Sequence, residues 1–67
     1  MTLVKSYLYQ VRHKKGLTLE GLALISGISK SEINNIENNM VSPRLDTLYH
    51  LAKALNCSIT DLFEDVK

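Results

Sequence analysis

The sequence predicts an all-α domain of five short helices, and three observations support this prediction. Apolar residues recur at intervals of three and four positions along most of the chain, which is the spacing of one helix face. Capping boxes of the form S-x-x-[ED], which start helices, begin at Ser29 and Ser58. Helix-interrupting residues are sparse, with three glycines and one proline in 67 residues. A chain of this length indicates one domain, residues 1–67.

The first helix is predicted from about Leu3 to Lys15. Val4, Leu8 and Val11 lie at i, i+4 and i+7 and form one apolar stripe. Gly16 follows this segment as its expected C-terminal cap, a position where the backbone often adopts a positive φ.

Residues 18–38 are predicted to form two further helices joined by a tight turn at Gly27. Thr18 is a suitable N-cap for the first of them, because its hydroxyl can accept a hydrogen bond from an unpaired backbone N–H. Leu22, Ala23 and Ile25 are its expected buried positions.

The helix that follows Ser29 is predicted to have two chemically different sides. Ile33 and Ile36 fall on one side, and Glu32 completes the capping box with Ser29. The other side carries Lys30, Ser31, Asn34, Asn35 and Asn38. Asparagine is a poor helix former, so three of them in five positions indicate a role other than helix formation.

The fourth helix is predicted to start at Ser42-Pro43, with serine as the cap and proline at the first helical position. Its apolar face consists of Leu45, Leu48, Leu51, Ala52 and Leu55. A fifth, shorter helix is expected after Ser58, because Ser58 and Asp61 form the second capping box.

Composition excludes several classes of protein. The net charge of +1 argues against a general electrostatic nucleic-acid binder, although Lys5, Arg12, His13, Lys14 and Lys15 lie in the first fifteen positions. No long apolar run or signal-peptide pattern is present, so we expect a cytoplasmic protein without a membrane partner. His13, His50 and the single Cys57 lack metal-ligand spacing. Catalytic and phosphate-loop motifs are absent too, so we expect neither an enzyme, a cofactor nor a small-molecule ligand.

Nearly the whole chain, from about Val4 to Phe63, resembles a known family. The matching pattern is R-x-x-K-G-L-T-x-x-x-L-A-x-x-x-G-I-S-x-x-x-I-x-x-I-E-N, then P-x-L-x-T-L-x-x-L-A-x-A-L, then S-I-T-D-L-F. It is similar to the Cro/phage-repressor (XRE-type) helix-turn-helix family. This resemblance implies a five-helix lambda-repressor-like DNA-binding domain, with the helix-turn-helix at 18–38 and a recognition helix at about 30–38.

The resemblance also implies which residues read bases. Lys30, Ser31 and Asn35 match the base-reading positions of the family, and Asn34 lies on the same face. Asparagine can pair bidentately with adenine, and lysine can reach guanine. Glu32 matches a further position near bases, where it would accept from cytosine; alternatively it only holds the helix start as part of the capping box. The alternative for the whole face is a solvated surface.

Candidate phosphate contacts flank the recognition helix, where the DNA backbone would pass. They are Thr18, Leu19, Ser29, Asn38, Asn39 and Arg44. Arg44 has the chemistry best suited to phosphate. For Ser29, the alternative is that its side chain only caps the helix. The family often has glutamine where this chain has Leu19, and a polar residue where it has Gly21. Backbone N–H groups at that helix start would remain available to a phosphate.

A matched arginine and glutamate, Arg12 and Glu37, are implied to be a structural ion pair that joins the first helix to the third. The apolar fifth helix and the edge of the fourth provide the candidate dimer contacts. These are Tyr49, Ile59, Phe63 and Val66. The alternative is that Ile59 and Phe63 cover the core of their own subunit.

The expected function is therefore a sequence-specific transcriptional regulator that binds double-stranded DNA, acting as a homodimer on a palindromic operator. A phage-type repressor and a restriction–modification controller both fit this description. The rival hypothesis is a protein–protein interaction module of the same fold, such as an antitoxin or an accessory factor. Leu19, Gly21 and the low net charge favour the rival.

Overall fold

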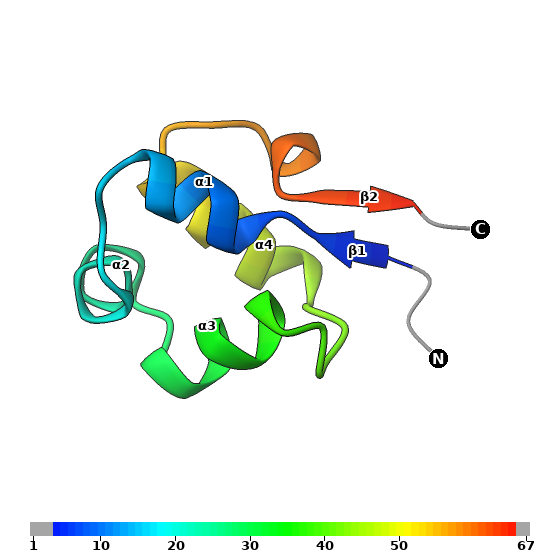
Figure 1. The fold of residues 1–67 in the computed structure, drawn as a ribbon, viewed down its shortest axis with the longest axis horizontal. Helices are drawn as coiled ribbons and strands as arrows, with labels where there is room; N and C mark the ends of the chain where they lie inside the picture. The colour runs from blue at the N-terminus through cyan, green and yellow to red at the C-terminus, as the bar shows by residue number, and fades with distance from the viewer. Residues whose placement is uncertain (1–3, 66–67) are drawn as a thin grey trace.

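A computed structural model describes residues 4–65, which form four α-helices, one 3₁₀ turn and a two-stranded antiparallel ribbon. In chain order, the elements are β1 (Val4–Ser6), α1 (Leu8–Lys14), α2 (Leu19–Ser26), α3 (Lys30–Glu37), α4 (Leu45–Ala54), η1 (Ile59–Asp61) and β2 (Phe63–Asp65). Figure 1 shows α3 along the lower side of the molecule, with α2 at one end and the ribbon at the other. The helical helix-turn-helix architecture is as predicted, but the predicted count of five helices is not matched, and the all-α prediction did not include the two-stranded ribbon.

The core lies between the helices, and each of them contributes apolar side chains to it. The side chains with almost no exposure are Leu8, Leu22, Ile33, Ile36, Leu51, Leu55 and Leu62. All seven sit at the predicted helical spacing or beside a predicted cap. Apolar burial of this kind is the main stabilising contribution in so small a chain.

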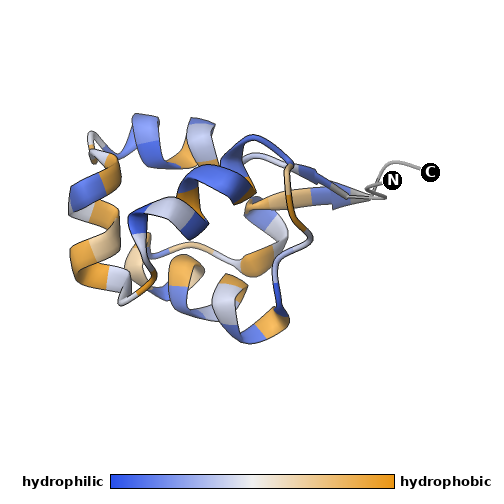
Figure 2. Ribbon diagram, turned by 90° about the horizontal axis from the view of Figure 1, so that it is seen from below, coloured by the Kyte–Doolittle hydropathy of each residue, from blue (hydrophilic) through white to orange (hydrophobic). Residues whose placement is uncertain are grey.

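Helix α2 departs from its predicted burial. Ile25 was expected in the core, but 54% of it is exposed, and its neighbour Leu24 is 85% exposed. In Figure 2, α2 is mostly orange and α3, which is nearer the viewer, is mostly blue or white. The reason is geometric: only the Leu22 side of α2 faces α3 and α4, so a second apolar side remains on the surface.

The first predicted helix is shorter than expected at its N-terminal end. Its predicted start at Leu3 lies outside the described residues, and Val4–Ser6 form a strand that pairs with Phe63–Asp65. The register places Lys5 opposite Glu64. Between the strand and α1, Ser6 Oγ accepts a hydrogen bond from the backbone N–H of Leu8 at 3.2 Å, and Tyr7 is the N-terminal cap residue of the helix. A pairing partner almost sixty residues away overrides the local helical spacing here.

The last two predicted helices also change. Helix α4 begins at Leu45 rather than at Ser42-Pro43, and Asp46 Oδ1 accepts from the backbone N–H of Thr47 at 2.9 Å. The predicted fifth helix is the single 3₁₀ turn η1. Its Ser58–Asp61 capping box is present, but the chain leaves the turn at Leu62 to form β2. Within residues 4–65, no helix is long and apolar enough to cross a membrane.

Candidate nucleic-acid interface

Two hydrogen-bonded caps and one glycine fix the geometry of the α2–α3 unit. Thr18 Oγ1 accepts from the backbone N–H of Gly21 at 2.9 Å, and Ser29 Oγ accepts from that of Glu32 at 3.2 Å. Between the helices, Gly27 adopts a φ of 76°, a left-handed conformation that side chains disfavour. These local features set the angle at which α3 leaves α2.

The N-terminal cap of α2 also accounts for Gly21, a residue that weakens helices. A Cβ at this position would lie 3.2 Å from Thr18 Oγ1, the atom that accepts the Gly21 N–H. Glycine avoids this tight contact with the cap, although the equivalent cap of α3 forms with Glu32 at the same position. Leu19, beside it, is half-buried against the core.

Helix α3 separates its apolar and polar residues as predicted. Ile33 and Ile36 are 0% and 1% exposed and hold the helix against the core. Lys30, Ser31, Asn34 and Asn35 are all exposed on the opposite side. Helix α3 is therefore held against the core by its two isoleucines, and its outer surface carries hydrogen-bonding side chains and few charges.

Glu32 differs from the other candidate base-reading residues. It is half-buried, and its Oε2 lies 3.4 Å from the hydroxyl of Thr47 on α4. Only one half of the predicted capping box is among the described hydrogen bonds, that from the Glu32 N–H to Ser29. The carboxylate therefore leans toward α4, which favours the structural interpretation of this residue.

An ion pair joins α1 to the C-terminal end of α3. Arg12 Nε donates to Glu37 Oε2 at 2.6 Å and Arg12 Nη2 donates to Oε1 at 3.1 Å. The remaining guanidinium nitrogen, Nη1, donates to the carbonyl of Leu17 at 2.8 Å. The two side chains are only 10% and 5% exposed. The hydrogen bond to Glu37 raises the pKa of Arg12 above its usual value.

The residues after α3 contact other parts of the fold. Asn38 Nδ2 donates to the carbonyl of Asn34 at 3.0 Å. Asn39 has a φ of 59°, and its Oδ1 accepts from the backbone N–H of Ser6 at 3.0 Å. The side-chain oxygen of Asn39 thereby ties the end of the candidate interface to β1.

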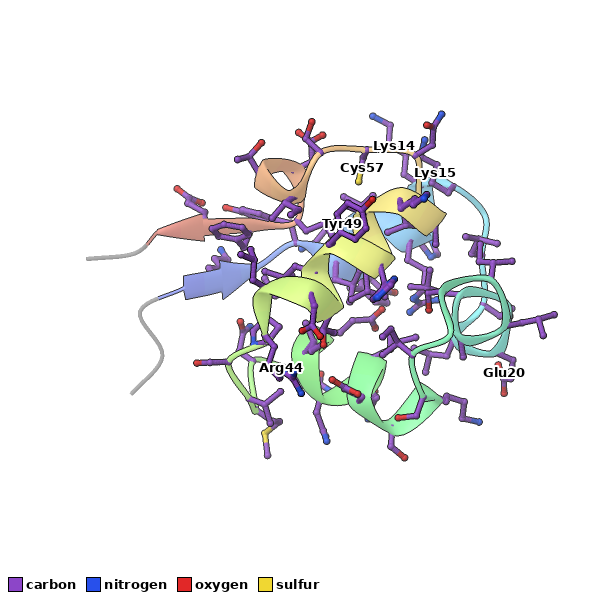
Figure 3. The ribbon with its side chains drawn as sticks, turned by 180° about the vertical axis from the view of Figure 1, so that it is seen from behind. Lys14, Lys15, Glu20, Arg44, Tyr49 and Cys57 are labelled. Carbon is purple, nitrogen blue, oxygen red and sulfur yellow. The ribbon has the colours of Figure 1, made fainter. Side chains whose placement is uncertain are left out.

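Arg44 is exposed at the N-terminal end of α4, where its Nη2 lies 3.2 Å from Asp46 Oδ2. Figure 3 shows Arg44 and Glu20 on the same side of the molecule as α3, whereas Lys14 and Lys15 lie at the opposite side. The basic residues at the end of α1 therefore stand away from α3. The place of a basic residue in the fold, rather than the number of basic residues, therefore decides which positive charges lie on the side of α3.

Sequence reasoning missed Glu20, which lies in the first turn of α2. Its Oε2 is 2.9 Å from Lys30 Nζ, in a pair whose side chains are 70% and 56% exposed. The hydrogen bond from Lys30 lowers the pKa of Glu20 below its usual value. Ten residues separate the two positions, so no helical spacing links them. Only the turn at Gly27 brings them together.

The candidate dimer residues do not form one uniform surface. Tyr49 is 52% exposed on α4, whereas Ile59 and Phe63 are half-buried against the core, and Val66 lies outside the described residues. Leu45, predicted for the apolar core face of α4, is instead 73% exposed one turn before Tyr49. Sequence spacing could not reveal this, because Leu45 matches the same helical pattern as its buried neighbours.

These features, a capped helix, a glycine turn and a second capped helix anchored by two isoleucines, match a known family model. A model described as Helix-turn-helix, HTH_3, covers residues 8–62. The chain belongs to this family. It is the Cro/phage-repressor type of helix-turn-helix that the sequence pattern resembles.

Relatives of this helix-turn-helix chain are named as transcriptional regulators. The HTH-type transcriptional regulator PuuR of Escherichia coli is 34% identical over 58 residues, which are 87% of this chain and 31% of PuuR. This chain thus spans about a third of that relative's length. The uncharacterized HTH-type transcriptional regulator y4dJ of Sinorhizobium fredii is 38% identical over 60 residues, 90% of this chain and 78% of y4dJ.

A solved structure has a similar fold. The restriction–modification controller protein C.AhdI of Aeromonas hydrophila superposes with a TM-score of 0.77 at 31% identity. The match covers 81% of this chain and 82% of that one. The arrangement of helices around α3 is therefore shared with a controller protein of comparable length.

Proposed function

We propose that this helix-turn-helix protein is a sequence-specific, DNA-binding transcriptional regulator. The observation that carries the proposal is the outer face of α3, where Lys30, Ser31, Asn34 and Asn35 are exposed while Ile33 and Ile36 are buried beneath them. An α-helix fits the major groove, and amide and ammonium groups can bond to the edges of adenine and guanine there. Low charge combined with exposed amides favours base reading over general attraction to phosphate.

In this proposal, the phosphate contacts come from the start of α2 on one side of α3 and from the start of α4 on the other. Arg44 is exposed on the α3 side of the molecule, and the backbone N–H groups at the start of α2 would face the opposite strand. Of the candidates between them, Thr18 and Ser29 already accept cap hydrogen bonds, and Asn38 donates within α3. Arg44 is therefore the strongest single phosphate contact in this proposal.

The active form in this proposal is a homodimer on a palindromic operator. Two recognition helices spaced about 34 Å apart would read successive major grooves on one side of the duplex. Tyr49 and Leu45 supply an exposed apolar stripe on α4. Next to Leu45, a cavity of about 200 Å³ is lined by Ser42, Pro43, Leu45, Leu48 and Phe63. A second copy that covers this stripe would bury it, as association of such patches usually does.

Selection of bound duplexes from a random pool tests the proposal. A regulator of this kind should enrich a motif with two inverted half-sites, and its affinity should fall steeply as salt rises from 50 to 200 mM. Failure to enrich any motif, together with binding that ignores salt, would reject the proposal.

The rival function is a protein-binding module of the same fold, such as an antitoxin or accessory factor. Its support is the apolar surface of α2, where Leu24 and Ile25 are 85% and 54% exposed. Such patches often mark protein contacts. Replacing both residues with serine should leave DNA binding unchanged if α3 carries the function, and should abolish partner binding under the rival.

A further inference from the structure

The Glu20–Lys30 ion pair lies where the two helices of the motif meet the candidate DNA surface. Glu20 stands in the first turn of α2, and Lys30 is the first residue of α3. Their charged atoms are 2.9 Å apart, and both side chains extend into solvent. An exposed pair of this type contributes little to folding. A carboxylate next to a phosphate-binding helix start is also unfavourable for binding DNA in general. Glu20 itself is favoured in the first turn of α2 by the helix dipole, but this effect does not require a partner at Lys30. General affinity for DNA therefore leaves the pairing of Glu20 with Lys30 unexplained.

We propose that Glu20 is a specificity-determining residue, which directs the Lys30 ammonium to a base edge and disfavours its transfer to a phosphate. This inference rests on the proposed DNA-binding function. An ammonium group has three donors, and one of them is occupied by Glu20. The others remain for the paired acceptors O6 and N7 of a guanine, whose partial charges repel the carboxylate less than the full negative charge of a phosphate does.

Phosphate binding by Lys30 has a different consequence for Glu20. A lysine that swings to the DNA backbone leaves the carboxylate without its partner and close to negative charge. Lys30 can therefore bind a guanine edge with its ion pair intact, whereas binding a phosphate either breaks the pair or brings a full negative charge close to the Glu20 carboxylate. The free-energy difference between Lys30 bound to a guanine and Lys30 bound to a phosphate appears as a difference in affinity between operator and unrelated DNA.

The Glu20→Gln variant tests this inference by fluorescence anisotropy with the selected operator duplex and a scrambled duplex. Without the carboxylate, Lys30 is released to phosphates, so affinity for the scrambled duplex should rise about fivefold, and its salt slope should steepen by about 0.9. Affinity for the operator should rise less, so the ratio of the two affinities should fall several-fold. The melting temperature should stay close to that of the wild type, because the pair is exposed.

Two matched variants separate the pair from general charge. Glu64→Gln changes the net charge equally but lies on β2, and its amide oxygen still accepts from the Tyr7 hydroxyl. It should shift both affinities by the same factor. In a Lys30→Gln background, Glu20→Gln should no longer change the ratio, since coupled residues show non-additive effects.

An unchanged ratio in Glu20→Gln, or an equal fall of the ratio in Glu64→Gln, overturns the inference while the proposed function stands. A wild-type protein that binds operator and scrambled duplex equally, or binds neither, overturns both.

Discussion

Arg12 and Glu37 meet side-on, with two guanidinium nitrogens on two carboxylate oxygens at 2.6 and 3.1 Å. The pair is almost fully covered, and a third nitrogen of Arg12 binds the carbonyl that follows α1. This geometry ties α1, the start of the α2 segment and the end of α3 to one guanidinium. The position of α3 therefore depends on Arg12, a residue of α1 that lies 25 positions before Glu37 in the sequence.

Removal of one partner should be costly, because the other charge stays buried and unpaired. We expect Arg12→Ala to lower the free energy of unfolding by about 3 kcal/mol. Lys14→Ala, an exposed change in the same helix, should lower it by less than about 1 kcal/mol. Urea or thermal unfolding followed by circular dichroism measures both. Equal stabilities would show that the pair has no structural role. If Arg12→Ala does not fold, Glu37→Gln provides a milder test of the same contact.

Asn35 is the sharpest test of base reading, because its side chain is exposed and has no intramolecular hydrogen bond among the described residues. We expect Asn35→Ala to weaken operator binding by about 1–3 kcal/mol, the usual value of a bidentate base contact. Affinity for scrambled DNA should hardly change. Anisotropy titrations measure both affinities, and Gln10→Ala on the exposed side of α1 is the control. Intact operator affinity in Asn35→Ala would assign this face to solvent.

Arg44 should act on every DNA sequence alike, because a phosphate contact carries no base information. We expect Arg44→Ala to weaken operator and scrambled duplexes by the same factor and to reduce the salt slope by about one. The structure should be retained, since the Arg44 side chain is exposed and so is Asp46, its ion-pair partner. Titrations at several salt concentrations provide the slope. A loss confined to the operator would instead make Arg44 a base-reading residue.

Tyr49 should control assembly if the α4 stripe is the dimer surface. We expect Tyr49→Ala to weaken dimerisation by about 2 kcal/mol, a typical cost for a buried aromatic anchor. Tyr9→Ala is the matched control, because Tyr9 is 49% exposed on α1 and Tyr49 is 52% exposed. Light scattering and sedimentation at micromolar concentration report the association. A wild type that is monomeric both alone and on the operator would remove the dimer from the proposal.

Local sequence signals were sufficient for the central motif. Caps at Thr18 and Ser29, glycine at the turn and isoleucines one turn apart act within a few residues of chain, so they can be read without knowing the fold. Buried apolar positions could be predicted for the same reason, except where a helix such as α2 has more apolar surface than its neighbours cover. The coarse fold and the outer face of α3 follow from these short-range rules.

Long-range contacts decided the rest. The helical spacing through Val4 gives way to a strand because β2 returns beside it, and Asn39 accepts a backbone hydrogen bond from that strand. Glu20 meets Lys30 only after the turn folds α2 onto α3. Residues distant in sequence come together only when the core closes, so their pairings depend on packing rather than on periodicity. Residue types and their local spacing established the family and its helices, whereas tertiary packing determined which charges and strands meet.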